Sequence, residues 1–129
     1  MSRIENSYVY VGRAAQLLAE LTAGRRVIVV TDDTVRLHYF GLISQFEHIT
    51  IREGESAKSL ETVGMVYSEL IRRGADRTTM LVGIGGGIVT DITGFVGATF
   101  MRGVDFGFVA TTLLAQVDAS LGGKNGVNV

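Results

Sequence analysis

Short apolar runs separated by helical patterns most strongly limit how this chain of 129 residues can fold. Val27–Val30 and Met80–Ile84 contain no alternating polar residues, which is typical of strands buried on both faces. His48–Ile51 indicates another strand between them. A helix that Gly74 would end is expected before Met80, because apolar residues recur at helical spacing at Leu60, Val63, Tyr67, Leu70 and Ile71.

The alternation of strand and helix continues on both sides of this region. Residues 14–21 carry a helical repeat that Gly24 would end, and a helix is expected from Gly87 to about Phe100. A strand near Phe106–Ala110 and a helix over residues 112–121 complete the series. The sequence therefore predicts an α/β fold with a Rossmann-like, mainly parallel sheet and helices on both faces, in which ligands bind beyond the carboxyl ends of the strands.

Composition and charge argue against several classes of function. Twelve basic and thirteen acidic residues give a net charge of -1, so we expect no nucleic-acid partner and no attraction to an anionic membrane. The chain has no cysteine, which excludes disulfides and thiolate sites. Its first six residues contain no apolar signal core, and the longest uncharged stretch, residues 78–90, is too short to span a bilayer. We expect a cytoplasmic protein and treat residues 1–129 as one domain.

Three consecutive glycines, Gly85, Gly86 and Gly87, are the sharpest local signal for a binding site. They join an expected strand to an expected helix, where backbone N–H groups can approach a phosphate or diphosphate closely. Ile88 occupies the third glycine position of the usual dinucleotide fingerprint, and no Gly-Lys-Ser/Thr of a P-loop follows. A tight turn with Asp91 in the following helix explains the same residues equally well.

Other polar residues lie at the same predicted edge of the sheet. Asp32 could accept hydrogen bonds from a ribose or cap a helix, and the loop Glu53–Lys58 could hold an adenosine or cap the next helix. Thr111 and Thr112 could contact a sugar or phosphate, or cap a helix. For each of these groups the local pattern favours capping over ligand binding.

The last fifty residues contain isolated charges in apolar or glycine-rich surroundings. Asp118 lies within an apolar helical pattern and is either exposed or directed into a site, and Lys124 follows two glycines in a composition that suits an anion or a surface turn. Arg102 lies on a turn. His38 and His48 have no metal-ligand spacing, and no complete acid-base pair or nucleophilic triad is present. The pattern indicates a binding region without a complete catalytic set.

The stretch from Gly85 to Asn128 resembles 3-dehydroquinate synthase, the second enzyme of the shikimate pathway. Three blocks in the family's order and spacing carry the resemblance: Gly85-Gly86-Gly87-Ile88-Val89-Thr90-Asp91-Ile92-Thr93-Gly94-Phe95-Val96, Phe100-Met101-Arg102-Gly103-Val104 and Thr111-Thr112-Leu113-Leu114-Ala115-Gln116-Val117-Asp118-Ala119-Ser120-Leu121-Gly122-Gly123-Lys124. Weaker similarity extends upstream through Gly54-Glu55 with Lys58 and Val30-Thr31-Asp32. Thr90, Ala110 and Asn125 depart from the family, which usually has glycine, proline and threonine there.

The resemblance implies that residues 1–129 are the N-terminal NAD-binding domain of such an enzyme. The adenosine side of NAD would be held by Asp32, Glu55 and Lys58. Its diphosphate and nicotinamide ribose would be held by the glycine turn Gly85, Gly86 and Gly87 and by Asp91. Thr111 and Thr112 would line the same cofactor. The heptulosonate phosphate substrate would be bound by Asp118, Lys124 and, from the neighbouring subunit of a homodimer, Arg102.

The resemblance also implies a reaction that these residues would not complete by themselves. In the family, NAD oxidises a hydroxyl, phosphate is eliminated, the carbonyl is reduced back, and aldol closure gives 3-dehydroquinate, so NAD is recycled. A divalent metal, zinc or cobalt, is held by a glutamate and two histidines in a second, helical domain. We therefore expect no metal site within this chain and no turnover by these residues alone.

Two alternatives remain. The first is a related sugar-phosphate cyclase or a glycerol dehydrogenase-like enzyme, which shares the glycine-rich loop and the two-domain plan. The second is a non-catalytic nucleotide-binding module with a flavodoxin-like sheet.

Overall fold

The structure is a computed structural model that describes residues 2–4, 7–9, 18–20 and 22–110. Within these residues, four strands form a parallel sheet in the order β4-β3-β5-β6, and two more form a separate antiparallel pair, β1-β2. The strands of the two sheets are β1 (Ser2–Ile4), β2 (Ser7–Val9), β3 (Val27–Asp32), β4 (Glu47–Ile51), β5 (Met80–Gly85) and β6 (Phe106–Ala110). The expected mainly parallel, Rossmann-like sheet is confirmed.

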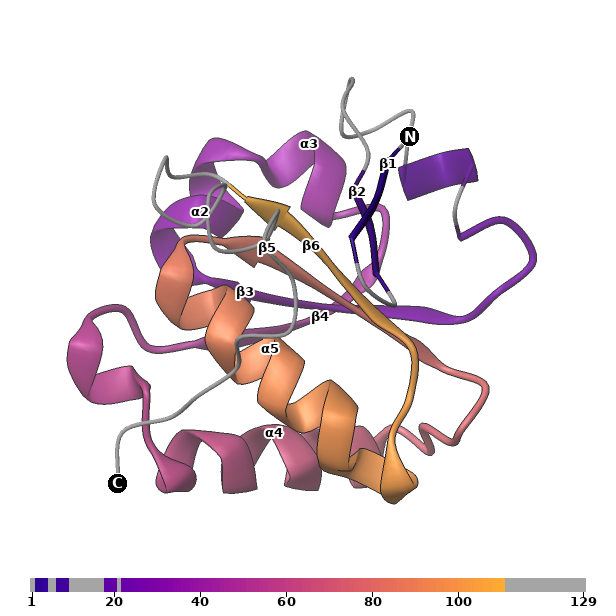
Figure 1. The fold of residues 1–129 in the computed structure, drawn as a ribbon. Helices are drawn as coiled ribbons and strands as arrows, with labels where there is room; N and C mark the ends of the chain where they lie inside the picture. Colours follow the sequence, from indigo (N-terminus) through magenta and orange to yellow (C-terminus); the bar gives the residue numbers. More distant parts are fainter. Residues whose placement is uncertain (1, 5–6, 10–17, 21, 111–129) are drawn as a thin grey trace.

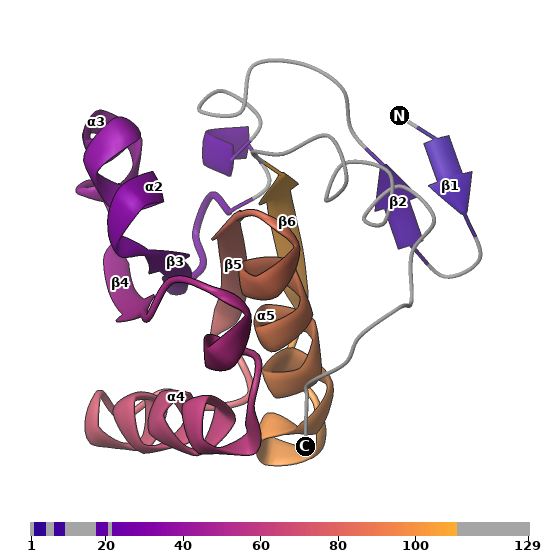
Figure 2. The same cartoon turned by 90° about the vertical axis from the view of Figure 1, so that its left-hand side faces the viewer.

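Helices cover both faces of the parallel sheet (Figures 1 and 2). One face carries α4 (Leu60–Arg72) and α5 (Gly87–Thr99), and the other carries α2 (Asp33–His38) and α3 (Phe40–Ile43). The connection from β3 leads to β4 on one side, whereas the next two connections lead in the opposite direction across the sheet. Because parallel connections are right-handed, crossovers in opposite directions place their helices on opposite faces.

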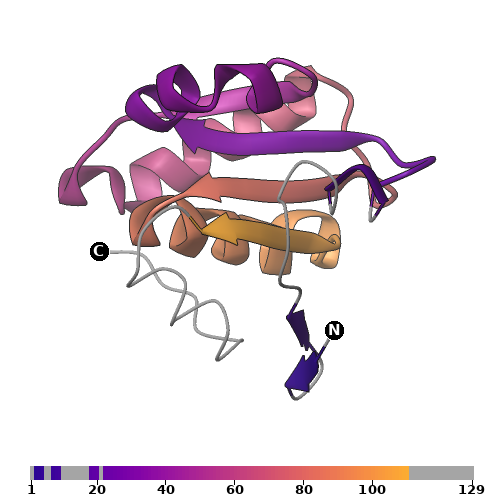
Figure 3. The ribbon, with the colours of Figure 1, turned by 90° about the horizontal axis from the view of Figure 1, so that it is seen from above.

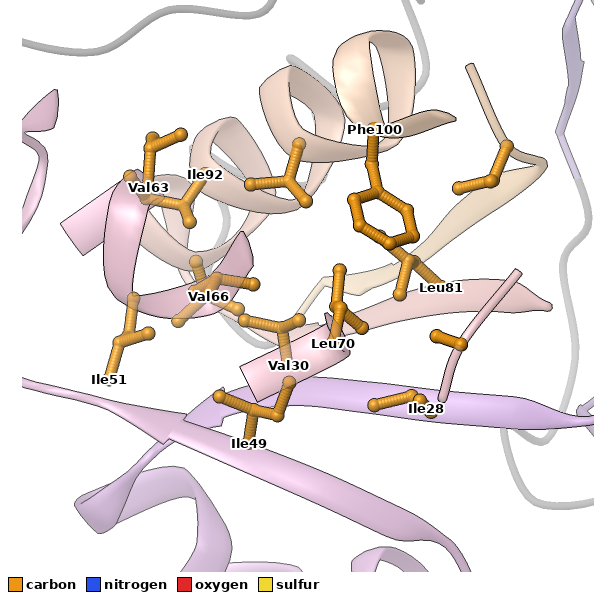
Figure 4. Close-up of a cluster of buried hydrophobic side chains, with 14 residues drawn as sticks. Ile28, Val30, Ile49, Ile51, Val63, Val66, Leu70, Leu81, Ile92 and Phe100 are labelled. Carbon is orange, nitrogen blue, oxygen red and sulfur yellow. The ribbon is translucent and has the colours of Figure 1, made fainter. Parts of the chain in front are cut away.

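Each face of the sheet packs its own apolar core because side chains alternate along every strand. Ile28 and Val30 point toward α4 and α5, where they meet Val66, Leu70 and other buried residues (Figure 4). The alternate residues of the same strand, Val27 and Val29, pack with residues of α2, α3 and β5 on the opposite face. This two-sided burial explains why the strand has no polar alternation.

Two glycines that the sequence predicts at helix ends have left-handed backbones, and Gly74 lies just beyond the end of α4, whereas residues 14–17 and 21 of the other expected helix lie outside the described residues. Gly24 has a φ of 77° and Gly74 a φ of 70°, in the region that glycine adopts without a steric cost. At the other end of α4, the Ser59 side chain accepts a hydrogen bond from the backbone N–H of Thr62. These local signals explain why the bounds of α4 agree closely with the sequence pattern.

The buried stripe of α4 differs from the one expected. Val63, Val66 and Leu70 are buried, but Leu60 is 52% exposed and Ile71 is 65% exposed. At about 100° per residue, these two lie roughly a quarter turn from the centre of the stripe, on the flank of the helix. The spacing of the apolar residues predicted helix α4 correctly, but packing against the sheet and α5 determines which side of this helix is buried.

The amino ends of the strands are joined by ion pairs, on the edge opposite the predicted ligand site. The Arg26 guanidinium contacts both carboxylate oxygens of Glu47, at 2.8 and 3.0 Å, and donates to the carbonyl oxygens of Arg73 and Gly74. Arg73 lies 3.8 Å from the same carboxylate. The hydrogen bonds from Arg26 lower the pKa of Glu47, and burial opposes this only in part.

Acidification is expected to remove this contribution to stability. The folded-state pKa of Glu47 lies below its unfolded value, so the stabilisation is fully present above the unfolded pKa of about 4.3 and is lost as the pH falls through the folded pKa. Because the Glu47 side chain is 40% exposed, solvent screening limits the effect to about 1 kcal/mol or less. Urea unfolding of wild type and Glu47→Gln should differ at pH 7 and converge near pH 3. A difference that stays constant between these pH values would contradict the assignment.

Candidate nucleotide-binding site

The candidate site lies where the order of the sheet reverses. The chain leaves β3 for β4 on one side and returns to β5 on the other, so the carboxyl ends of β3 and β5 border the switch point of an open α/β sheet. In Figure 3 the arrowheads of β3, β5 and β6 lie at the same edge. Asp32 ends β3 and Gly85 ends β5, so the fold brings two of the predicted residues to this point.

The glycines of the turn between β5 and α5 have different surroundings. A Cβ on Gly85 would lie 2.8 Å from both Cβ and Cγ2 of Val89, so packing between strand and helix requires this glycine. Among the described residues, a Cβ on Gly87 would meet nothing within 4 Å. Packing therefore does not explain Gly87, and the space beside it suits a ligand that approaches the backbone.

The amino end of α5 is suited to an anion. Its N-cap is Gly86, which has no side chain with which to cap the helix. The first N–H groups of a helix have no partner within the helix, and they carry a positive partial charge. Thr90 is buried, and its hydroxyl donates a hydrogen bond to the carbonyl oxygen of Gly87, 3.1 Å away. Its hydroxyl therefore binds the first turn of α5.

Two carboxylates hold the start of α2. Asp32 is the N-cap and accepts a hydrogen bond from the backbone N–H of Val35 at 2.8 Å. Glu53, in the loop after β4, accepts from the backbone N–H of Thr34 at 2.9 Å and from the Thr34 hydroxyl. The capping role considered for Asp32 is confirmed, and its proposed contact with a ribose stays a prediction. Glu53 fixes one end of the loop that carries Glu55 and Lys58.

The other end of this loop is joined to α5 by an ion pair. Lys58 Nζ lies 2.8 Å from Asp91 Oδ2, and the two side chains are only 24% and 21% exposed. Ala57, the preceding residue, is completely buried. The loop Glu53–Lys58 thus runs from the start of α2 to the first turns of α5, and it places a lysine beside the glycine turn.

Arg102 lies away from this edge, on a turn with an unusual backbone. Met101 and Arg102 have φ values of 51° and 66°, which non-glycine residues rarely adopt, and Gly103 follows at 109°. Both Met101 and Arg102 are exposed. The Gly103 N–H donates to the carbonyl oxygen of Phe100, and that of Val104 to Gly97, both at 2.7 Å. The turn holds Arg102 outward, where it could reach a neighbouring molecule.

Several predicted site residues fall outside the part of the chain that the structure describes. Thr111, Thr112, Asp118 and Lys124 lie outside the described residues, as does the expected helix over 112–121. Among the described residues, no group of three or more His, Asp or Glu side chains could hold a metal ion. The same part of the chain contains no helix with the length and apolar character needed to cross a membrane.

Residues 48–129 match the family described as 3-dehydroquinate synthase N-terminal. The chain belongs to this family. A 3-dehydroquinate synthase from Vesicomyosocius okutanii is 39% identical over 130 residues, covering 93% of this chain and 36% of that protein. One from Sulfurovum sp. (strain NBC37-1) is 44% identical over 117 residues, covering 86% and 33%. The chain thus spans about a third of the length of these synthases, and the resemblance found in the sequence is confirmed.

Solved structures related to the synthase family share the fold. A 2-epi-5-epi-valiolone synthase from Streptomyces hygroscopicus, with NAD+ and Zn2+ bound, matches all of this chain and 39% of its own, with 29% identity and a TM-score of 0.81. A 2-deoxy-scyllo-inosose synthase complexed with carbaglucose-6-phosphate, NAD+ and Co2+ matches 92% of this chain and 36% of its own, with 27% identity and a TM-score of 0.74. A probable glycerol dehydrogenase from Sinorhizobium meliloti matches 76% and 25%, with 26% identity and a lower TM-score of 0.55.

Sequence reasoning missed the roles of Thr31 and Thr34. The Thr31 hydroxyl donates to the carbonyl oxygen of Ile84 on the neighbouring strand, and Thr34 binds Glu53 from 19 positions away. A threonine beside an aspartate at the end of a strand is a common capping pattern, so no local signal indicates these long-range bonds. A polar residue at the end of an otherwise apolar buried strand is the one feature that could have directed attention to Thr31.

Proposed function

We propose that this chain is the NAD-binding domain of a 3-dehydroquinate synthase that converts 3-deoxy-D-arabino-heptulosonate 7-phosphate to 3-dehydroquinate and phosphate. The observation that carries the proposal is the glycine turn at the switch point, where a Cβ on Gly87 would meet no atom of the described residues within 4 Å and the N-cap of α5 is a glycine. Because the chain belongs to the 3-dehydroquinate synthase family, we expect a nucleotide to bind at that turn. The relatives named 3-dehydroquinate synthase are 39% and 44% identical to this chain, whereas the inosose and valiolone synthase structures are 27% and 29% identical.

The described residues fit the diphosphate of a dinucleotide. The backbone N–H groups at the start of α5 would donate to phosphate oxygens. Asp32 and Glu55 would accept hydrogen bonds from the adenosine ribose, and Lys58 would lie on the same adenosine side of the cofactor. When bound, NAD supplies a reversible hydride acceptor, and the role of this chain is to hold it in a fixed orientation.

The substrate side of the proposal rests on residues matched to the family. Asp118 would contact substrate hydroxyls, Lys124 the phosphate region, and Arg102 the phosphate bound by the other subunit of a homodimer. The exposed left-handed turn at Met101 and Arg102 supports the last role, because strained backbone is kept where a side chain must be aimed. Residues 1–129 alone would release no phosphate, since the family's metal ligands lie in another domain. Metal-dependent activity from these residues alone would contradict this.

A related sugar-phosphate cyclase is the second candidate, favoured by the structural match to the valiolone synthase. The intact protein that contains these residues should release inorganic phosphate from the heptulosonate phosphate, and release should depend on added NAD and a divalent metal. Glucose 6-phosphate and glycerol serve as competing substrates. Phosphate release from glucose 6-phosphate alone would favour the cyclase, and glycerol oxidation without phosphate release would contradict both.

Nucleotide binding separates these enzymes from a non-catalytic module. Isothermal titration calorimetry of the intact protein with NAD, NADP and FMN should show a preference for NAD. A clear preference for FMN would contradict the assignment of every cofactor residue.

A further inference from the structure

The parallel sheet divides at its carboxyl end, between β3 and β5. Pairing of β3 with β4 continues to Asp32, and pairing of β5 with β6 continues to Gly85. Pairing between β3 and β5, in contrast, ends at Val30 and Gly83. The last two residues of each strand therefore extend beyond the shared ladder, and the two strands form a fork at the switch point.

One buried side chain joins the two sides of this fork. Thr31 is the first residue of β3 beyond the shared ladder, and its hydroxyl donates to the carbonyl oxygen of Ile84 at 2.8 Å. Both residues are 0% exposed. Ile84 is likewise the first residue of β5 beyond the ladder, so a side-chain hydrogen bond continues the link between the strands for one more residue.

The residues that follow this bond are the predicted ligand contacts. Asp32 comes directly after Thr31, and Gly85 comes directly after Ile84. The ion pair of Lys58 with Asp91 also joins the surrounding elements, but its two side chains are partly exposed, and both residues are themselves proposed contacts of NAD. The hydrogen bond from Thr31 to Ile84 is buried within the sheet, so we expect it to be present whether or not a ligand is bound.

We propose that Thr31 is a positioning residue for dinucleotide binding, whose hydroxyl fixes the spacing between Asp32 and the glycine turn. This inference rests on the proposed function, because it concerns the same NAD site. A dinucleotide that contacts both sides of the fork binds tightly only if the two sides are held at the right separation before it arrives. Valine at this position keeps the shape of the side chain but leaves the Ile84 carbonyl without its donor.

The test compares Thr31→Val with Thr31→Ser in the intact protein. Calorimetry with NAD should show a dissociation constant about tenfold higher for Thr31→Val, with the fraction of binding-competent protein unchanged. Thr31→Ser keeps the hydroxyl and should stay within about threefold of wild type. Thr93→Val is the matched control, because Thr93 is equally buried and its hydroxyl also donates to a carbonyl oxygen, that of Val89 within α5, at 2.8 Å. It should leave the dissociation constant unchanged.

Amide hydrogen exchange without nucleotide gives an independent measurement. Residues 84–87 should exchange faster in Thr31→Val than in wild type or Thr31→Ser, because the fork has lost its link. Equal NAD affinity and equal exchange in wild type and Thr31→Val would overturn the positioning role. A fall in binding-competent fraction with an unchanged dissociation constant would also overturn it, since that is the signature of a purely structural residue.

Two further outcomes keep the inference separate from the proposed function. If wild type binds no NAD, the proposed function fails, and exchange at residues 84–87 alone decides whether Thr31 fixes the fork. If Thr31→Val does not fold, Thr31→Ala is compared with Thr31→Ser, since this pair differs only in the hydroxyl. Weaker binding and faster exchange in Thr31→Ala support the proposal, and equality of the two variants overturns it.

Discussion

Alanine at Gly97 is expected to lower the free energy of unfolding by about 1–3 kcal/mol, although alanine favours a helix more than glycine does. A Cβ on Gly97 would lie 2.4 to 2.8 Å from Cδ1, Cγ and Cβ of Phe106 on β6. Two of these atoms lie close to the backbone of Phe106, so rotating the ring cannot relieve the contact. Helix α5 and strand β6 would have to move apart.

Alanine at Gly64 in α4 is the matched control for Gly97→Ala. Gly64 also lies within a 13-residue helix, but a Cβ there would meet nothing within 4 Å. Gly64→Ala should therefore raise the free energy of unfolding by about 0.5–1 kcal/mol. Urea unfolding of the intact protein measures both variants. The same sign of change for both would contradict the packing of α5 against β6.

Alanine at Gly87 is expected to weaken NAD binding by about tenfold or more, with stability changed by less than about 0.5 kcal/mol. The added methyl group would meet no atom of residues 2–4, 7–9, 18–20 and 22–110 within 4 Å, so this part of the fold has room for it. That same space is where the proposed diphosphate would approach the start of α5. Calorimetry with NAD and urea unfolding of the same preparation separate the two effects.

Two other glycines serve as comparisons for Gly87→Ala. Gly85→Ala should lower stability, because its Cβ would lie 2.8 Å from the Val89 side chain. Gly41→Ala in α3 should leave NAD binding unchanged and should not lower stability, since a Cβ there would meet no atom of the described residues within 4 Å. Unchanged NAD affinity in Gly87→Ala would remove the glycine turn from the site.

Much of the sheet could be predicted from local patterns. The strand at Val27–Val30 and the helix ended by Gly74 depend on a continuous apolar run and on a residue that tolerates a positive φ. The short helices α2 and α3 were not expected. They contain only six and four residues, too few for an apolar repeat to be recognised. Their packing against the sheet stabilises them instead.

The candidate site could be predicted only in part, because some of its contacts join residues that are far apart in the sequence. The glycine turn and Asp32 are visible as local motifs, and parallel strands bring them to one edge. The bonds of Thr31 to Ile84 and of Glu53 to Thr34 join residues 53 and 19 positions apart. Neither pairing follows a sequence period, so no motif predicts it.

The sequence by itself determined that this chain alternates strand with helix, and it identified the family through three ordered blocks. The alternation of strand and helix depends on residues that are close together in the chain, and the family blocks depend only on the identity and order of the residues. Only the tertiary structure decided that Gly85 is required by packing while Gly87 has open space beside it, and that a single threonine hydroxyl closes the fork of the sheet. Those distinctions depend on which atoms of distant segments face each glycine and carbonyl, and contacts of this kind exist only after the sheet and its helices have come together.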